Sequence, residues 1–271
     1  MIMRYHEAPI DIFDAVQAET DGDYALVHLF EDKLIGEQYY NKFKRAVENG
    51  RDVILDNSIF ELGVAFDEAK YVNWIKKLKP TYFVIPDVLE DGDATWQRAH
   101  AFMNKYPELA SISKSIGVVQ GKSYEDMKHC YKKLHDLVDI IAFSFDLSTY
   151  ADYVRRALKY PLSNLEATSM GRATLLAKMV DEGVLDTEKP HHLLGVALPQ
   201  EMYAYRNCSW IRSVDTSNPI VHGMYGITYT TKGLTTKIKT KMCDLMGSKV
   251  TPSEWFHIQH NILMFEEFCN G

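Results

Sequence analysis

The sequence has no apolar run long enough to span a membrane, and its first residues lack the basic and then hydrophobic order of a secretion signal. We therefore expect a soluble, cytoplasmic protein without a membrane partner. Cysteine is also scarce, and the cysteines form neither a CxxC pair nor a dense framework. This spacing predicts reduced thiols, with no disulfide and no cysteine zinc site, at Cys130, Cys208, Cys243 and Cys269.

The usual signatures of metal and nucleotide sites are missing as well. The chain has no His-x-His pair of the kind that barrel metallohydrolases carry on a strand. His191 and His192 are adjacent, so they would point to opposite faces of a strand. His257 and His260 would share a helix face without an obvious carboxylate partner, which favours a surface position. No glycine-rich phosphate loop precedes a helix. We therefore predict neither a metal nor any other cofactor.

Basic residues are outnumbered by acidic ones, 30 to 37, which gives a net charge of −7. This balance argues against a nucleic-acid partner, since the phosphate backbone favours clustered Lys and Arg. The segment 228–249 is an exception, with five lysines and one acid. It is interpreted either as a solvated lysine-rich face or as a nucleic-acid contact, in which case the contacting residues are Lys232, Lys237, Lys239 and Lys241.

What the chain does contain is a regular alternation of short apolar runs and amphipathic helical patterns. Strands are predicted at 24–30, 52–56, 82–85, 115–120, 138–144, 192–196 and 208–215, with 225–229 as the weakest candidate for an eighth. Helices are predicted at 36–49, 67–79, 92–105, 123–136, 150–158, 170–182, 199–206 and 252–268. Seven or eight such units suit a (β/α)₈ TIM barrel better than an open sheet. We predict one domain over 1–271, with the basic segment 228–249 before a closing helix.

Polar residues and glycine recur where the predicted strands end. In a barrel the carboxyl ends of the strands form the mouth that carries the reactive groups. A single Asp at the end of a strand is commonly a turn or capping residue. Here, however, six polar or glycine residues lie at the carboxyl ends of predicted strands: Asp56, Asp87, Gln120, Ser144, Gly195 and Asp215. A carboxylate pair suits retaining glycosyl transfer, in which one acid attacks the sugar carbon and the other moves protons. An amide such as that of Gln120 suits the edge of a heterocycle.

Three ordered motifs carry a family resemblance: Asp56-Asn57-Ser58-Ile59-Phe60-Glu61, Gly117-Val118-Val119-Gln120-Gly121 and His192-Leu193-Leu194-Gly195-Val196, followed by Asp215. Over about 52–219 the chain resembles the tRNA-guanine transglycosylase superfamily. The resemblance implies that Asp215 is the nucleophile that forms a covalent glycosyl-enzyme intermediate and that Asp56 is the general acid/base. It also implies that the purine is bound by Asp87, Gln120, Gly121 and Gly195, by Phe60 and Leu194 on its two faces, and by the strand end at Ser144 and Phe145. Phe60 and Leu194 could alternatively belong to the core.

Departures from the family pattern narrow the expected substrate. The zinc-binding cysteine cluster of the tRNA enzymes is absent, Thr216-Ser217-Asn218-Pro219 replaces the usual Pro-Thr-Arg, and Lys122 replaces a glycine. These features are similar to the compact, phage-encoded branch that places 7-deazaguanine derivatives into DNA. The implied partners are DNA and a free 7-deazapurine base, in the host cytoplasm if the protein is phage-encoded, with a homodimer as one option for the assembly. The alternatives are a tRNA base exchanger, an N-glycosidase or other barrel hydrolase, and a non-catalytic nucleic-acid-binding barrel.

Overall fold

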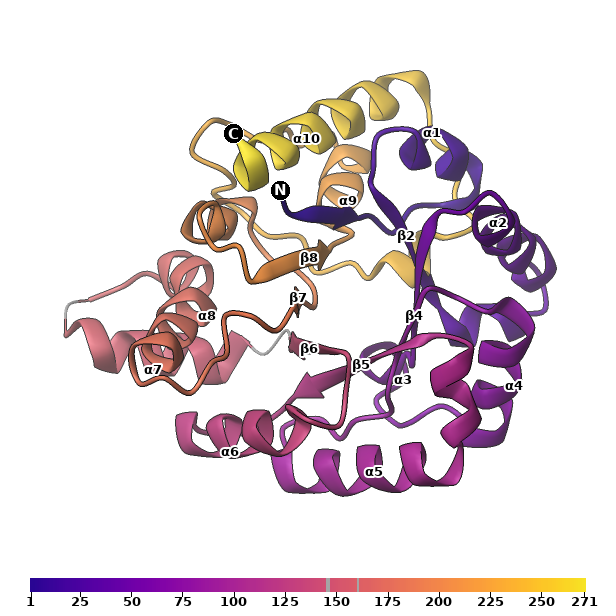
Figure 1. Cartoon of the computed structure of the whole chain (residues 1–271). Helices are drawn as coiled ribbons and strands as arrows, with labels where there is room; N and C mark the ends of the chain where they lie inside the picture. Colours follow the sequence, from indigo (N-terminus) through magenta and orange to yellow (C-terminus); the bar gives the residue numbers. More distant parts are fainter. Residues whose placement is uncertain (145–146, 160) are drawn as a thin grey trace.

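The computed structural model describes residues 1–144, 147–159 and 161–271. Eight parallel strands close into a barrel in which each strand pairs with the next and β1 pairs with β8 (Figure 1). The predicted (β/α)₈ barrel is therefore confirmed. The strands are β1 (Met3–Tyr5), β2 (Gly22–Leu26), β3 (Asp52–Asp56), β4 (Tyr82–Val84), β5 (Lys114–Val119), β6 (Ile140–Phe143), β7 (His191–Leu193) and β8 (Ile211–Asp215).

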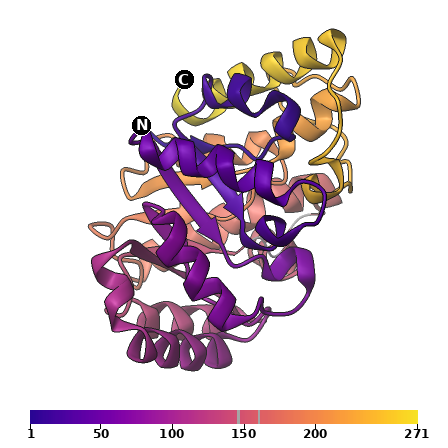
Figure 2. The same cartoon turned by 90° about the vertical axis from the view of Figure 1, so that its right-hand side faces the viewer.

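Helices surround the barrel (Figures 1 and 2). The α-helices are α1 (Phe13–Gln17), α2 (Gly36–Glu48), α3 (Ile59–Leu62), α4 (Glu68–Leu78), α5 (Gly92–Lys105), α6 (Tyr124–Leu134), α7 (Leu147–Leu158), α8 (Asn164–Asp181), α9 (Asn218–Met224) and α10 (Pro252–Asn270). Short 3₁₀ helices are η1 (Ile10–Ile12), η2 (Val27–Glu31), η3 (Pro107–Ser111), η4 (Pro199–Tyr205) and η5 (Met242–Leu245). Side-chain caps at Asp67, Asp91, Ser123, Ser163 and Thr251 fix where five of these helices begin.

The strand that closes the barrel is not the one that the sequence predicted. The candidate strand at 225–229 was wrong: this stretch is irregular, and the Tyr229 N–H donates to Asn261 Oδ1 of α10 at 2.7 Å. Its place is taken by β1, which the sequence did not reveal because three residues are too few to show a periodicity. The predicted strand 24–30 was also too long, because the chain turns into η2 after Leu26.

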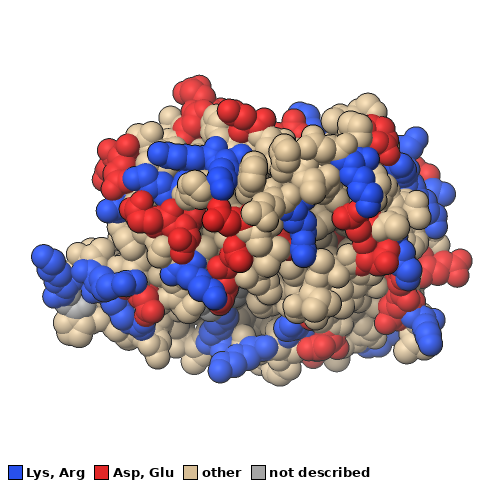
Figure 3. Space-filling view, turned by 90° about the horizontal axis from the view of Figure 1, so that it is seen from below, with Lys and Arg blue, Asp and Glu red and all other residues tan. Residues whose placement is uncertain are grey.

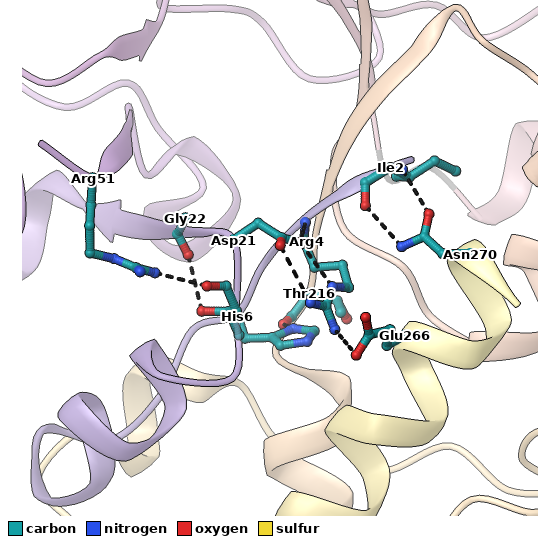
Figure 4. Close-up of polar contacts among 10 residues, drawn as sticks. Ile2, Arg4, His6, Asp21, Gly22, Arg51, Thr216, Glu266 and Asn270 are labelled. Atoms are coloured by element: carbon teal, nitrogen blue, oxygen red, sulfur yellow. Dashed lines mark hydrogen bonds and ion pairs between the residues drawn. The ribbon is translucent and has the colours of Figure 1, made fainter.

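Contacts from three directions hold β1 in place (Figure 4). Arg4 forms ion pairs with Asp21 at 2.9 Å and with Glu266 of α10 at 3.1 Å. Ile2 exchanges two hydrogen bonds with Asn270, so the two termini lie side by side (Figures 1 and 2). His6 Nδ1 donates to the Thr216 carbonyl at 3.0 Å, which ties the residues after β1 to those after β8. The first and last strands of the barrel thus meet in a fixed register.

Two connections depart from the simple strand–helix repeat. Between β6 and β7 the chain forms a pair of packed helices, α7 and α8, which project from the barrel at the left of Figure 1. Between α9 and α10 the lysine-rich segment 228–249 is irregular except for η5, and its residues 237–242 lie over the mouth of the barrel. All four cysteines are free thiols, as predicted. Among the described residues, none of the helices is both long and apolar enough to cross a membrane.

The outer helices carry charges of both signs in alternation. Figure 3 views the molecule from the side of α5 and α6, where basic and acidic side chains are interspersed. Lys105 of α5 pairs with Glu68 of α4 at 2.7 Å, and Lys133 of α6 pairs with Asp93 of α5 at 2.9 Å. Lys105 and Lys133 are therefore each neutralised by a neighbouring acid.

Candidate functional site

A cavity of about 810 Å³ opens at the carboxyl ends of the strands. Strand-end residues form its floor and walls, and residues 237–242 of the lysine-rich segment form one side of its rim. Eleven of the residues predicted at the site line this one cavity: Asp56, Phe60, Asp87, Gln120, Ser144, Leu194, Gly195, Asp215, Lys237, Lys239 and Lys241. A purine nucleoside fits within a volume of this size.

Asp215 ends β8, and one of its carboxylate oxygens is fixed by two donors. His192 Nε2 lies 2.9 Å from Oδ1, and the backbone N–H of Gly195 donates to the same oxygen at 3.0 Å. Because an ionised carboxylate only accepts hydrogen bonds, Nε2 carries the proton in this contact, while Nδ1 lies 2.8 Å from the Ser213 hydroxyl. No hydrogen bond from the described part of the chain reaches Oδ2, so this oxygen is left for a ligand in the cavity.

Asp56 ends β3 and is held in a different environment. Its Oδ1 accepts a hydrogen bond from the Tyr24 hydroxyl at 3.0 Å, and its Oδ2 accepts from the Ser58 N–H at 2.7 Å. Burial raises the pKa of Asp56 well above its usual range, and the nearby charge of Glu61 raises it further. The environment of Asp56 therefore favours its protonated form more than water does.

Asp87 forms a buried network with two amide side chains. Asn57 Nδ2 donates to its Oδ1 at 2.9 Å, and Gln120 Nε2 donates to its Oδ2 at 2.7 Å. The side-chain amide oxygen of Gln120, Oε1, accepts a hydrogen bond from the Glu90 N–H at 3.1 Å. Burial raises the pKa of Asp87, although the two amide donors oppose this shift. The network presents a rigid polar edge to the cavity from the ends of β3, β4 and β5.

Two further acids line the cavity and were not predicted to act there. Burial raises the pKa of Glu7 well above its usual range, with further contributions from Glu61, Asp215 and Asp56. Burial likewise raises the pKa of Glu61, whose Oε2 has no hydrogen-bond partner among the described residues. Glu7 follows β1, and because that strand escaped detection its strand-end acid could not be recognised. Glu61 belongs to the first motif, but nothing in the sequence showed that it turns inward.

An aromatic ring and lysines form the outer rim. Phe60 is 52% exposed, so it is not a core residue. The Lys241 ammonium lies 4.9 Å from the centre of its ring and donates to the Phe60 carbonyl at 3.2 Å. Burial lowers the pKa of Lys237, and Lys239 lowers it further. Leu194 is half-buried and packs partly against the core while also lining the cavity.

The remaining predicted residues are placed as follows. The Ser144 side chain is buried at the cavity wall, and its hydroxyl has no hydrogen-bond partner in the described structure. Gly121 is not among the lining residues; a Cβ there would come within 2.8 Å of Asp126 and Met127 of α6, so the glycine permits close packing. Lys232 lies in the turn 230–233, beside η4, where the Tyr203 hydroxyl donates to the Thr231 carbonyl. Phe145 falls outside the described residues.

The described side chains include no group of three or more His, Cys, Asp or Glu arranged to hold a metal ion. His260 Nε2 instead contacts the Tyr229 carbonyl at 3.0 Å. In the sequence His192 was weighed as a metal ligand and quoted in the third motif, but it was given no role at the site, whereas the structure places its Nε2 2.9 Å from Asp215 Oδ1. Its inward position, two residues before Leu194, was the available signal, because alternate strand residues face the barrel interior.

No family model matches the chain, and a search of curated proteins finds no match either. The barrel is confirmed by the strand pairing, whereas membership of the transglycosylase superfamily stays a prediction carried by the three motifs and by the cavity that they line.

Proposed function

We propose that this protein is a base-exchange transglycosylase that replaces guanine in DNA by a 7-deazaguanine derivative through a covalent aspartyl-glycosyl intermediate. The observation that carries the proposal is the contrast between two acids in one cavity. Both acids are buried, but Asp215 has one oxygen fixed by donors and the other available, whereas both oxygens of Asp56 accept hydrogen bonds and its pKa is raised. Two carboxyl groups whose environments differ in this way suit a nucleophile and a proton donor.

In the first half of the proposed reaction, a guanine nucleotide rotates out of the stack into the cavity, because its glycosidic carbon is shielded inside a duplex. Oδ2 of Asp215 attacks the anomeric carbon, the bond from that carbon to the guanine nitrogen breaks, and its electron pair leaves with the base. The Asp56 proton passes to the departing guanine and neutralises it. The sugar is then held as an ester of Asp215.

In the second half, a free 7-deazapurine takes the place of guanine. Its ring nitrogen loses a proton to Asp56 and attacks the anomeric carbon, and the ester bond to Asp215 breaks. Two inversions restore the original configuration. One N-glycosidic bond is broken and another is formed in the exchange, so the reaction requires neither an oxidant nor a nucleoside triphosphate. Asp87 and Gln120 offer a carboxylate and an amide to the edge of either base, and Phe60 offers a stacking surface.

The test is to incubate the protein with isotopically labelled guanine and either duplex DNA or tRNA, followed by mass spectrometry of the nucleosides. Label is expected in DNA with the natural protein and not with Asp215→Asn. Asp244→Asn, which removes an exposed acid outside the cavity, is the matched control and should retain exchange. Undiminished exchange by Asp215→Asn would remove Asp215 from the role of nucleophile.

The same experiment separates the alternatives. Label in tRNA alone would assign the tRNA reaction, and abasic DNA without incorporated base would assign an N-glycosidase. Binding of DNA without either product, unaffected by Asp215→Asn, would indicate a non-catalytic barrel. Repeating the incubation with unlabelled 7-deazaguanine bases that differ at position 7 then identifies the base that is inserted.

A further inference from the structure

Arg172 of α8 is the most completely buried cation near the site, and its guanidinium reaches three backbone carbonyls. Nη1 donates to the Leu194 carbonyl at 2.8 Å and to the Phe143 carbonyl at 3.2 Å, and Nη2 donates to the Gly195 carbonyl at 2.9 Å. Nε forms a 2.8 Å ion pair with Glu201 of η4. The side chain does not line the cavity. It therefore acts behind the cavity wall, on the chain that follows β7.

One peptide group connects this guanidinium to Asp215. The carbonyl of Leu194 and the N–H of Gly195 belong to the same planar trans peptide, so they point in opposite directions. Arg172 binds the carbonyl end, and the N–H end donates to Asp215 Oδ1 at 3.0 Å. The positive charge orients the peptide dipole toward the carboxylate. It also polarises the N–H, which strengthens the hydrogen bond that this N–H donates.

The backbone conformation of Gly195 determines where its N–H and its carbonyl point. Its φ is +56°, in the left-handed region that other residues rarely adopt. This turn lets the Gly195 N–H face Asp215 while its own carbonyl faces Arg172. The carbonyls of Leu194 and Gly195 are therefore both directed to the guanidinium, and the chain between them has little freedom to rotate the N–H away from Asp215.

We infer that Arg172 is a positioning residue for the nucleophile: through the Leu194–Gly195 peptide it directs a polarised N–H at Asp215 Oδ1 and so leaves Oδ2 facing the reacting carbon. The inference rests on the proposed function for its catalytic consequence, but the positioning itself can be measured without any substrate. Glu201 in turn orients the guanidinium, and the Tyr205 hydroxyl donates to the same Glu201 oxygen at 3.2 Å.

The substrate-independent test follows the Gly195 amide by NMR in ¹⁵N-labelled protein. An amide that donates to a carboxylate resonates downfield, and Asp215→Asn provides the reference in which the charged acceptor is lost. In Arg172→Gln the Gly195 amide proton is expected to move upfield, toward its position in Asp215→Asn. Arg4→Gln is the matched control, because it removes another buried arginine from its ion pairs, which join β1 to Asp21 and to Glu266 of α10, and it should leave the Gly195 signal unchanged.

The catalytic test measures base exchange with labelled guanine. Removing one oriented donor from an active site lowers kcat by roughly 10²–10³-fold, and weakening one should cost less, so Arg172→Gln is expected to lower kcat by about 10- to 100-fold. The KM for the free base should change less than kcat, because Arg172 does not reach the cavity and acts on Leu194 and Gly195 only through their carbonyls. Arg172→Lys keeps the charge but cannot reach all three carbonyls, and it should fall between Arg172→Gln and the natural protein.

The two tests fail in distinguishable ways. A Gly195 signal that is the same in Arg172→Gln as in the natural protein would overturn the inference, as would a loss confined to KM. If the natural protein exchanges no base, the proposed function fails, and the NMR comparison still decides the positioning role. If Arg172→Gln does not fold, the NMR comparison is made with Arg172→Lys, in which a smaller upfield shift supports the inference and an unchanged signal overturns it.

Discussion

At the scale of single residues, the raised pKa of Asp56 makes the free energy of unfolding depend on pH. Below its ordinary pKa of 3.8, Asp56 carries a proton in both the folded and the unfolded chain. Above that pH the unfolded chain ionises while the folded chain retains the proton, so the folded state binds more protons and the free energy of unfolding falls as pH rises. The fall continues until the pH reaches the raised pKa of the folded state.

Asp56→Asn removes this dependence, so the variant should be more stable than the natural protein at neutral pH. The measurement is urea denaturation at pH 4.5 and pH 7.5, where the gain is expected to be larger at pH 7.5. Glu7→Gln should behave in the same way, since burial also raises the pKa of Glu7. A variant that is less stable than the natural protein at pH 7.5 would show that Asp56 is ionised in the folded state.

His192 is the second residue whose role can be tested directly. Its Nε2 donates to Asp215 Oδ1, and the ring is fully buried between Ser213 and Asp215. His192→Phe keeps a planar aromatic ring, somewhat larger than imidazole, and removes the hydrogen bond. We therefore expect kcat for base exchange to fall by about 10- to 100-fold, a smaller loss than the removal of an oxyanion-hole donor causes. His191→Phe is the control, because His191 packs on the opposite side against Tyr131 and Phe143. Equal losses in the two variants would indicate a packing effect.

The sequence predicted the acids of the site better than their supporting residues, for a physical reason. Asp56, Asp87 and Asp215 end recognisable apolar strands, and the carboxyl ends of parallel strands meet at one mouth. Their partners Tyr24 and Asn57 are chosen by three-dimensional proximity, which no spacing reveals, and only His192 gave a signal, through its inward position on the strand. Glu7 depended on a strand too short to recognise.

At the scale of elements, the α7–α8 projection is tied to the barrel by the ion pair between Arg172 and Glu201. Both side chains are almost fully buried. Burial alone would lower the pKa of Arg172, but the charge and hydrogen bond of Glu201, together with Tyr205 and Tyr150, outweigh it and raise the pKa, so the guanidinium stays charged. Removing one partner of such a pair leaves an uncompensated buried charge, which typically costs about 3–5 kcal/mol.

Glu201→Gln should therefore lower the free energy of unfolding by about 3 kcal/mol, at the low end of that range because the amide oxygen can still accept a hydrogen bond. The control is Asp152→Asn on α7, which removes an exposed pair with Arg155 at 3.7 Å and should cost less than about 0.5 kcal/mol. Urea denaturation measures both. Similar losses of unfolding free energy in the two variants would show that the buried pair stabilises the protein no more than the exposed pair does.

The close contact between α9 and α10 leaves no room for a side chain at Gly223. A Cβ on Gly223 would lie within 2.6 Å of the Ile258 backbone, so the helices must separate to accept it. Gly223→Ala should destabilise the protein by about 1–3 kcal/mol, as overpacking does elsewhere. Gly247→Ala, where the nearest atom is 3.9 Å away, should leave the melting temperature nearly unchanged. A neutral Gly223→Ala would mean that α10 is free to move from α9.

The element boundaries show where sequence patterns suffice and where they do not. Helices α2, α4 and α5 begin and end within one residue of prediction because an amphipathic face and a clear stop define them. By contrast, 225–229 has the composition of a strand but is held by Asn261, whose amide also donates to the Pro219 and Ile227 carbonyls. A buried polar side chain on a distant helix thus decides the local structure.

At the scale of the whole molecule, the uneven distribution of charge decides how a polyanion would approach. The chain is acidic overall, with a net charge of −7, and on the face shown in Figure 3 Lys105 and Lys133 are paired with acids of neighbouring helices. The lysine-rich segment instead places Lys237, Lys239 and Lys241 at the rim of the cavity. We therefore expect the mouth of the barrel to be the face that attracts the phosphate backbone.

This expectation can be measured as the salt dependence of DNA binding. Each phosphate neutralised by a lysine contributes about 0.9 to the slope of log affinity against log salt concentration. Lys237→Gln together with Lys239→Gln should therefore reduce the slope by about 2, and Lys232→Gln, outside the cavity rim, should reduce it less. Lys241 is left in place because it also supports the backbone at Phe60 and Glu61.

The matched control for net charge is Lys105→Gln together with Lys133→Gln. This double variant also removes two positive charges, but from α5 and α6, where both lysines are already paired with acids. If attraction depended only on total charge, the two double variants would weaken binding equally at every salt concentration. If the rim lysines contact phosphates, only the Lys237 and Lys239 variant changes the slope. Equal slopes in both would place the nucleic acid on another face and would separate DNA binding from the cavity that holds Asp56 and Asp215.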